Sequence, residues 1–309
     1  MRKFLEPVTI VFVALTLGFG ISAFFSYLRD RTEPLIPFTK SELSHYFFQE
    51  KVSHDELVYK YHNDQPIKIL LVAGHNDEYP GALFENTREV DLNIKVANYI
   101  YDILKNNPHF ETYVFQKEAG VFDEKISVYL GEKDHIENFK TSYQRLAKWF
   151  RGEDIDAILD DSLHTDTPEE IIQTLYAINA WANDGDIDIV IHIHFNDVNG
   201  RTKDDIGNLS GFSIYTPGDE LINKKVSYEL AASMEKQLLK ILVPSDNPEE
   251  KDIIIKNDSL IALGAFNTLN SASILIEYGF IYEEKFQSEE FLKNIARVTY
   301  LGLQTFLEK

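Results

Sequence analysis

The stretch "DIVIHIHFND", residues 188–197, sets two histidines inside a run of branched aliphatic residues. Such a run, bounded by acidic and amide residues, is typical of a strand that is buried in a sheet. Side chains alternate between the two faces of a strand, so His192 and His194 lie on the same face. Two imidazoles on one face are able to bind a metal ion. They are also compatible with core histidines that bond to backbone groups, and the strand alone leaves both interpretations open.

The segments around this strand predict an α/β domain over residues 67–309. "IKILLVAG" (67–74) and "ASILIEYGF" (272–280) are apolar runs of strand length, which suits strands buried on both faces. "NTREVDLNIKVANYIYDILKNN" (86–107) places apolar residues at spacings of three and four, which predicts a helix. This alternation indicates a single three-layer α/β domain, with a mixed, mostly parallel sheet and helices on both faces.

Other segments extend the same pattern, with one interruption. Two further strands and three further helices are predicted at residues 109–116, 211–218, 167–184, 222–242 and 288–308. Thr167 is the expected N-cap of its helix, with Pro168 in the first turn. Residues 120–170 are rich in charge and break the alternation, so they are predicted to be an insertion.

The composition excludes several kinds of function. The chain of 309 residues has a formal net charge of −20, which argues against nucleic acid as a partner because phosphates need clustered Lys and Arg. It contains no cysteine, so disulfides, thiolate metal sites and cysteine nucleophiles are ruled out. Any metal site must therefore use His and carboxylate ligands.

Residues 1–28 are predicted to be a membrane anchor. The segment "VTIVFVALTLGFGISAFFSYL" (8–28) has no charge and is long enough for a helix to cross a hydrocarbon core of about 30 Å. Arg2 and Lys3 precede it, which favours a cytoplasmic N-terminus and an extracytoplasmic body. A cleaved signal peptide is the alternative, and it would make the protein secreted. Residues 29–66 are polar and are predicted to be a linker that leads into a short helix.

Three further polar residues stand out within or beside apolar elements. His75 follows the C-terminal end of the first strand, the edge at which open α/β sheets bind ligands. Glu89 opens a helix, and a capping box with Asn86 is the alternative explanation for it. Glu277 lies among aliphatic residues of the last strand. Because an unpaired buried carboxylate is costly, Glu277 must be protonated, paired or close to a cation.

These residues match the inventory of a catalytic zinc site. Such a site commonly has three His or carboxylate ligands and leaves one position for a water molecule. His75, Glu89 and His194 fit the ligand set. Glu277 would remain as a general base, since a buried carboxylate has the raised proton affinity that this role needs.

Four blocks that carry these residues resemble the zinc-dependent N-acetylmuramoyl-L-alanine amidases of type 3, which cut peptidoglycan between the lactyl group of muramic acid and the stem peptide. The resemblance covers residues 67–308 and leaves the insertion unaccounted for. The blocks occur in the family's order and are "ILLVAGHNDEYPGALF", "REVDLNIKVANYIYDIL", "NAWANDGDIDIVIHIHFND" and "SASILIEYGFI".

The resemblance implies a role for each candidate residue. His75, Glu89 and His194 would be the zinc ligands, and Glu277 the base that takes a proton from the zinc-bound water. His192 replaces the family's usual serine and would act as a hydrogen-bond donor behind the metal or as a partner of the oxyanion. The substrate would be peptidoglycan or a muropeptide, at the extracytoplasmic face of a bacterial cell membrane.

The sequence also departs from the family. The usual Gly-His-Gly-Gly is replaced, with Asn76 and Asp77 in the positions of the two glycines. Some relatives carry an inserted helix that blocks the zinc until an activator protein removes it, and residues 120–170 stand where such an insert could lie. "FDEK" (122–125) and "DDSLHTDTPEE" (160–170) are then candidates for a fourth ligand.

Two other functions stay open at this point. One is a different zinc amidohydrolase or carboxypeptidase on a related scaffold, acting on peptide amides. The other is a catalytically silent envelope protein that binds cell-wall glycan or recruits partners, which the altered loop after His75 would favour.

Overall fold

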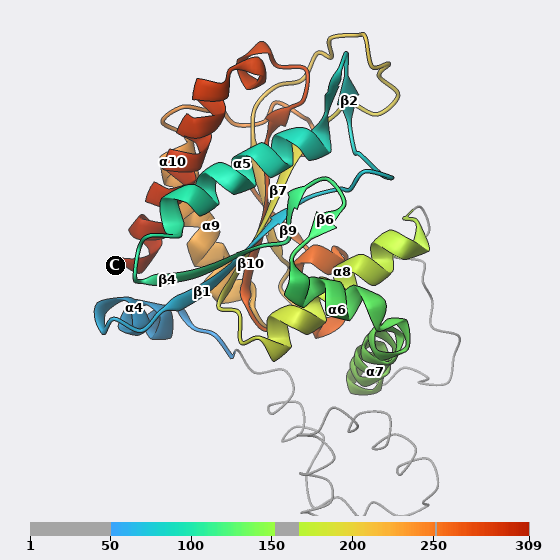
Figure 1. The fold of residues 1–309 in the computed structure, drawn as a ribbon, viewed down its shortest axis with the longest axis vertical. Coiled ribbons are helices and arrows are strands. Elements are labelled where there is room, and N and C mark those ends of the chain that lie inside the picture. Colours follow the sequence, from blue (N-terminus) through green and yellow to red (C-terminus); the bar gives the residue numbers. More distant parts are fainter. Residues whose placement is uncertain (1–50, 152–166, 251, 309) are drawn as a thin grey trace, which may run out of the picture.

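The computed structural model describes residues 51–151, 167–250 and 252–308 (Figure 1). The predicted anchor, residues 1–28, lies outside these ranges, as does most of the predicted linker. Within them, no helix has both the length and the apolar character that crossing a membrane requires. The described end of the linker contains helix α4 (His54–His62), whose N-cap Ser53 accepts a hydrogen bond from the backbone of Glu56.

A six-stranded mixed sheet forms the centre of the domain, as predicted. In spatial order the strands are β4 (Phe110–Val114), β1 (Ile67–Ala73), β7 (Ile189–Asn196), β10 (Ala272–Phe280), β8 (Ser213–Pro217) and β9 (Ile254–Asn257). The first four strands in this order are mutually parallel, β8 is antiparallel to β10, and β9 is parallel to β8. The stretch with the two histidines is therefore a central strand.

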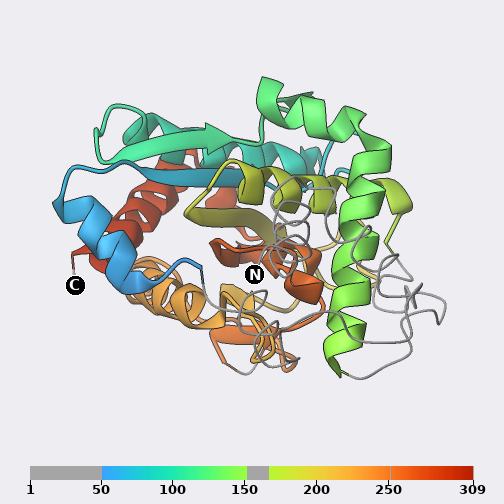
Figure 2. The ribbon, with the colours of Figure 1, turned by 90° about the horizontal axis from the view of Figure 1, so that it is seen from below.

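Helices cover both faces of the sheet, which confirms the three-layer architecture (Figure 1). One face packs against α5 (Glu89–Leu104), α9 (Lys224–Leu238) and α10 (Glu289–Leu307). The other packs against α8 (Glu169–Asp184) and α6 (Glu124–Gly131). Helix α7 (Lys133–Arg151) packs on α8, and Figure 2 shows it at the opposite end of the domain from α4 and the C-terminus.

Short elements fill the connections. Two hairpins are β2 (Leu83–Phe84) with β3 (Thr87–Arg88) and β5 (Gln116–Glu118) with β6 (Val121–Phe122). Three 3-10 helices span Ile261–Leu263, Ala265–Asn267 and Glu284–Gln287. The described part of the predicted insertion comprises β6, α6, α7 and, at residues 169–170, the start of α8.

The burial of β7 explains its apolar sequence. Ile189, Ile191 and Ile193 belong to the core under α5, α9 and α10, whereas Val190 belongs to the core under α8. A strand covered on both faces has no solvent side, so polar residues on it require a specific reason. His192 and His194 are the polar residues that require one.

Two predicted helix starts differ from those observed. Helix α5 begins at Glu89, and its N-cap is Arg88, whose side chain does not cap the backbone N–H groups of the first turn but donates to the carboxylate of Asp91. The capping box between Asn86 and Glu89 is therefore wrong, and the Glu89 carboxylate is free for another role. The N-cap of α8 is Pro168 rather than Thr167. Proline has an extended backbone there (ψ 138°), so the helix starts one residue later than predicted.

The central strand yields a test of the core. Ile191→Ala should lower the free energy of unfolding by about 2–5 kcal/mol, because it opens a cavity at a fully buried position. Urea denaturation followed by circular dichroism measures this change. Ile206→Ala, at a residue that is 76% exposed, is the matched control and should change stability by less than about 0.5 kcal/mol. Equal losses in both variants would contradict this account of the core.

Candidate metal centre

The polar candidates meet at the carboxyl edge of the parallel strands. His75 follows β1, His194 is near the end of β7, and Glu277 is near the end of β10. Glu89 enters from the first turn of α5. Parallel strands bring their carboxyl ends to one edge, and open α/β sheets bind ligands there.

His75, Glu89 and His194 form a compact cluster. Nε2 of His75 lies 3.0 Å from Oε2 of Glu89, and Nδ1 of His194 lies 3.0 Å from Oε1 of the same carboxylate. The two imidazole rings are edge to face with centroids 5.0 Å apart. The candidate ligand atoms of the three residues, one from each, all lie within 4.8 Å of one another. Among the residues that the structure describes, no other His, Asp or Glu group has this arrangement.

Glu89 is held by backbone donors as well as by the histidines. The side chain is 5% exposed, and its two oxygens accept hydrogen bonds from the backbone N–H of Ala82 (2.9 Å) and of Phe195 (3.2 Å). Asn93, one turn along α5, donates to Gly74 O at 3.1 Å and to Oε1 of Glu89 at 3.4 Å. These bonds fix the carboxylate between β7 and the loop after β1.

The protonation states suit a metal ligand set. Burial alone would raise the pKa of Glu89, but hydrogen bonds from His194 and His75 outweigh it and lower the pKa below its ordinary value. Burial lowers the pKa of His194. Glu89 is therefore ionised and His194 neutral near pH 7, and both are in the form that binds a metal ion.

The loop after β1 brings the backbone close to the ligands. His75 has a positive φ of 68°, and Gln116 holds the loop by donating to the carbonyls of Ala73 (3.1 Å) and His75 (2.6 Å). A Cβ on Gly74 would lie 2.1 Å from Cε1 of His194, and one on Gly81 would lie 2.3 Å from Oε2 of Glu89. Both positions therefore require glycine.

Asn76 and Asp77, which depart from the family pattern, have local structural roles. Asn76 Oδ1 accepts from the backbone of Tyr79 at 2.8 Å, and Asn76 N donates to Tyr79 O at 3.1 Å, so the pair closes a turn. Asp77 accepts from Arg88, the N-cap of α5, at 2.6 Å. The changed residues thus hold the loop against the helix that carries Glu89.

Glu277 stands beside His194 in the sheet. The two residues are opposite each other in the parallel pair β7–β10, so their side chains point to the same face. Oε2 of Glu277 is buried and has no hydrogen-bond partner among the residues that the structure describes. Burial raises the pKa of Glu277 well above its ordinary value, with further contributions from the negative charges of Glu89 and Glu250.

Glu250 is a buried acid that the sequence reasoning did not find. It is 4% exposed, and its Oε1 accepts from Asn196 Nδ2 at 2.8 Å and from the hydroxyl of Tyr215 at 2.9 Å. It comes from an irregular loop without a motif. Its electrostatic effect on Glu277 depends wholly on the tertiary structure, because the two residues are distant in sequence.

His192 is one pleat behind His194 on the same face, as predicted. It is 1% exposed, its ring hydrogen-bonds to the backbone of Ala262, and its Nε2 has no hydrogen-bond partner in residues 51–151, 167–250 and 252–308. Burial, with the neighbouring His194, lowers the pKa of His192 to about 3. His192 is therefore neutral at any pH at which the protein is expected to work.

A cavity of about 620 Å³ opens from the cluster toward α8. His75, His192 and His194 line one side of it. An apolar part of its lining consists of Ile171, Leu175 and Ile178 of α8, with Leu260 and with Leu275, which lies beside His192 in the sheet. The arrangement places a titratable cluster at the mouth of an apolar pocket, which is the usual form of a binding site.

The described part of the predicted insertion supplies no fourth ligand. In "FDEK", the Asp123 side chain caps α6 by accepting from the backbone of Lys125 at 2.9 Å. No acid of residues 120–151 or 167–170 joins the His75, Glu89 and His194 group. Residues 160–166 of the second candidate stretch lie outside the described residues.

The fold and the site together define an α/β protein with a candidate metal centre at the carboxyl edge of its sheet. The sequence model of the N-acetylmuramoyl-L-alanine amidase family matches residues 69–305. The chain therefore belongs to this family of peptidoglycan amidases, which confirms the resemblance seen in the four sequence blocks. A search of the curated proteins found no match.

Solved structures with a similar fold include several amidases. The CwlD amidase of Clostridioides difficile, solved in complex with the GerS lipoprotein, is 18% identical, with a TM-score of 0.52 over 78% of this chain and 98% of that one. Ami1 of Mycobacterium smegmatis is 13% identical, with a TM-score of 0.52 over 78% of this chain and 97% of that one. At these identities the likeness concerns the fold.

Gly74 provides a test of the cluster's geometry. Gly74→Ala should weaken zinc binding by about tenfold or more, because the new methyl group occupies the space of the His194 ring. Calorimetric titration of the metal-free protein with zinc measures this. Gly131→Ala, at a helix position where a Cβ meets nothing within 4 Å, is the control and should bind zinc as the parent does. Equal zinc affinity in all three proteins would contradict the observed packing.

His192 predicts a dependence of stability on pH. Its folded pKa of about 3 is below the unfolded value of about 6.5, so the unfolded chain takes up a proton that the folded protein does not. The contribution of neutral His192 to the free energy of unfolding is complete above pH 6.5 and is lost as pH falls toward 3. The free energy of unfolding should therefore fall by at most about 3 kcal/mol between pH 6.5 and 4.5 on account of this residue. Urea denaturation of the metal-free protein at several pH values measures this. His192→Ser should show a shallower decline, and an identical decline would contradict the prediction.

Proposed function

We propose that this protein is a zinc-dependent N-acetylmuramoyl-L-alanine amidase whose metal is held by His75, Glu89 and His194, with Glu277 as the general base. The observation that carries the proposal is the convergence of two imidazoles on one buried carboxylate, with a second, unpaired carboxyl in the adjacent strand. Family membership supports the amide bond of peptidoglycan as the one cleaved.

The donor set supports zinc as the metal. Two imidazole nitrogens and one carboxylate oxygen are a common ligand set of catalytic zinc, and the absence of cysteine excludes the thiolate-rich structural sites. When bound, zinc supplies Lewis acidity, which lowers the pKa of a water molecule to about 7 and polarises a carbonyl group. Asn93 and the backbone of Ala82 and Phe195 would orient Glu89 toward the ion.

Glu277 is suited to proton transfer. Its raised pKa gives the carboxylate a high affinity for the proton of the attacking water, and its unpaired Oε2 is not committed to another hydrogen bond. After the carbonyl is attacked, the protonated Glu277 can donate to the amine that leaves. One carboxyl group thereby serves as base and then as acid.

His192 is proposed to position the substrate. Since its ring bonds to the backbone of Ala262 and Nε2 has no partner, neutral His192 presents the Nε2 lone pair to the cavity. A lone pair accepts hydrogen bonds, so this state favours contact with a substrate N–H group over the donor role to an oxyanion. The apolar wall would take the methyl-bearing groups around the scissile amide.

The location and partners follow from this substrate. Peptidoglycan lies outside the bacterial cytoplasm, so we propose an extracytoplasmic site of action, with residues 1–28 as anchor or signal. We also propose residues 120–170 as an insertion on which an activator could act, by analogy with CwlD, which was solved with a lipoprotein. If removing the insertion leaves both folding and hydrolysis rates unchanged, this part is wrong.

Glu277→Gln separates chemistry from metal binding. It should lower the rate of amide hydrolysis by about 10²–10⁴-fold while zinc stays bound, because it removes proton transfer and leaves the ligands intact. Release of new amino groups from purified sacculi measures activity, and metal analysis measures zinc. Glu290→Gln, an exposed residue of α10, is the matched control and should keep full activity.

The other outcomes distinguish the alternatives. His194→Ala should lose both zinc and activity. Loss of zinc in Glu277→Gln, or activity that survives it, would show that the roles are assigned wrongly. Tight binding of sacculi by the parent protein without release of amino groups would indicate a silent envelope protein. Turnover of short peptide amides but not of sacculi would indicate a different amidohydrolase.

A further inference from the structure

Arg201 is a buried cation with every donor in use. It lies in the loop between β7 and β8, and its side chain is 3% exposed. A guanidinium group has five N–H donors. Two of them bind the Asp197 carboxylate, at 2.5 and 2.9 Å. The other three bind the carbonyls of Thr202 (2.6 Å), Asp205 (2.8 Å) and Leu83 (2.5 Å).

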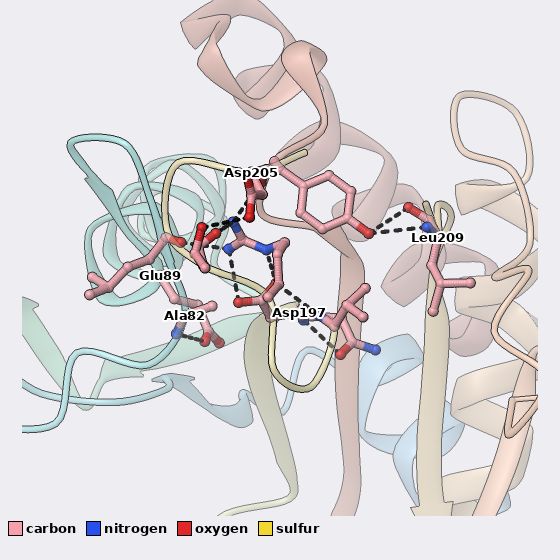
Figure 3. Close-up of polar contacts among 11 residues, drawn as sticks. Ala82, Glu89, Asp197, Asp205 and Leu209 are labelled. Atoms are coloured by element: carbon pink, nitrogen blue, oxygen red, sulfur yellow. Dashed lines mark hydrogen bonds and ion pairs between the residues drawn. The ribbon is translucent and has the colours of Figure 1, made fainter. Parts of the chain in front are cut away.

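These contacts join two segments that carry metal-centre groups. Asp197 follows the end of β7 and is three residues beyond His194. Leu83 adjoins Ala82, whose N–H donates to Glu89 at 2.9 Å. Figure 3 shows Ala82 and Glu89 on one side of this network and Asp197 and Asp205 within it. One side chain therefore connects the strand of His194 to the hairpin that holds Glu89.

Aromatic contacts add the strand of Glu277 to the same assembly. The guanidinium lies over the rings of Tyr282 and Phe84, with its central carbon 5.1 and 5.7 Å from the two centroids. Tyr282 follows the end of β10, and its hydroxyl bonds to both backbone groups of Leu209, as Figure 3 shows at Leu209. The loop that carries Arg201 is thus attached to the β10 end at a second point.

We propose that Arg201 is a positioning residue for the metal centre. It sets the distance between His194 and Glu89 by fixing the end of β7 and the β2–β3 hairpin to one rigid, planar group. The inference rests on the proposed function, since it assumes that these two residues bind the metal. Lysine cannot replace arginine here, because an ammonium group has three donors and cannot reproduce the planar five-bond pattern.

The contact differs from an ordinary surface ion pair. The Arg201 side chain is 3% exposed and that of Asp197 27%, so the ion pair is largely shielded from solvent, and the same guanidinium donates to the carbonyl of Leu83. Loss of the guanidinium leaves Asp197 and this carbonyl without their partner. The hairpin can then move relative to β7. Changes in groups that orient metal ligands typically cost 10–100-fold in affinity.

The test is Arg201→Lys in the full chain, with Arg297→Lys as the matched control. Arg297 is an exposed residue of α10 that donates to Asn294 one turn away, far in sequence from the hairpin and β7. Zinc affinity is measured by chelator competition, and the geometry of the site by the visible absorption of the cobalt(II)-substituted protein. We expect Arg201→Lys to bind zinc about 10–100-fold more weakly and to show an altered cobalt spectrum, with Arg297→Lys unchanged in both.

A stability measurement and a second variant make the result decisive. Parental zinc affinity and cobalt spectrum in Arg201→Lys would overturn the inference, whatever the change in melting temperature. If Arg201→Lys does not fold, Asp197→Asn, which keeps one oxygen acceptor, should show the same two effects at smaller size, and its failure to do so would overturn the inference. A parent protein that binds no zinc would instead refute the proposed function, and the inference with it.

Discussion

The carboxylate of Glu89 is the constraint on which the rest of the site depends. One buried group accepts hydrogen bonds from two imidazoles, two backbone amides and one side-chain amide, and these donors come from β7, α5 and the loop after β1. A carboxylate in such a place is stable only if all of these elements keep their relative positions. The fold of this edge of the sheet is therefore coupled to the protonation and ligation of this one residue.

Unsatisfied polar groups gather at the same edge. Within the described part of the chain, His192 Nε2, Glu250 Oε2 and Glu277 Oε2 are buried without hydrogen-bond partners, although natural proteins rarely leave such atoms unpaired. Most of the other residues of β7 and β10 are apolar and buried. The free-energy cost of burying these unpaired polar atoms is thus concentrated at the proposed active site. A bound cation and substrate would supply the missing partners. The five N–H donors of Arg201, by contrast, all have acceptors.

Much of this could be predicted because the signals are local. The apolar runs at 67–74 and 272–280 have the length and composition of strands buried on both faces, and both are strands. His194 and Glu277 were recognisable because each is a polar residue within an apolar strand. His75 was recognisable because it directly follows the carboxyl end of an apolar strand. Glu89 was ambiguous, since Asn86 offered an ordinary capping explanation that only the observed start of α5 removed. Gln116, Glu250 and Arg201 were missed because no periodicity or motif marks them, and their partners are distant in sequence.

The amino-acid sequence by itself determined five strands of the central sheet and the helices α5, α8, α9 and α10, though not β9, α6 or α7. It also determined which metal-ligand types were possible and which residues were unusual in their surroundings. These properties follow from periodicity and composition, which act over a few residues. The tertiary structure alone decided that two histidines and a carboxylate meet at one point, that the Nε2 of His192 is left without a partner, and that Arg201 ties β7 to the β2–β3 hairpin. The reason is that distances across a sheet depend on strand order and register, and a linear pattern contains neither.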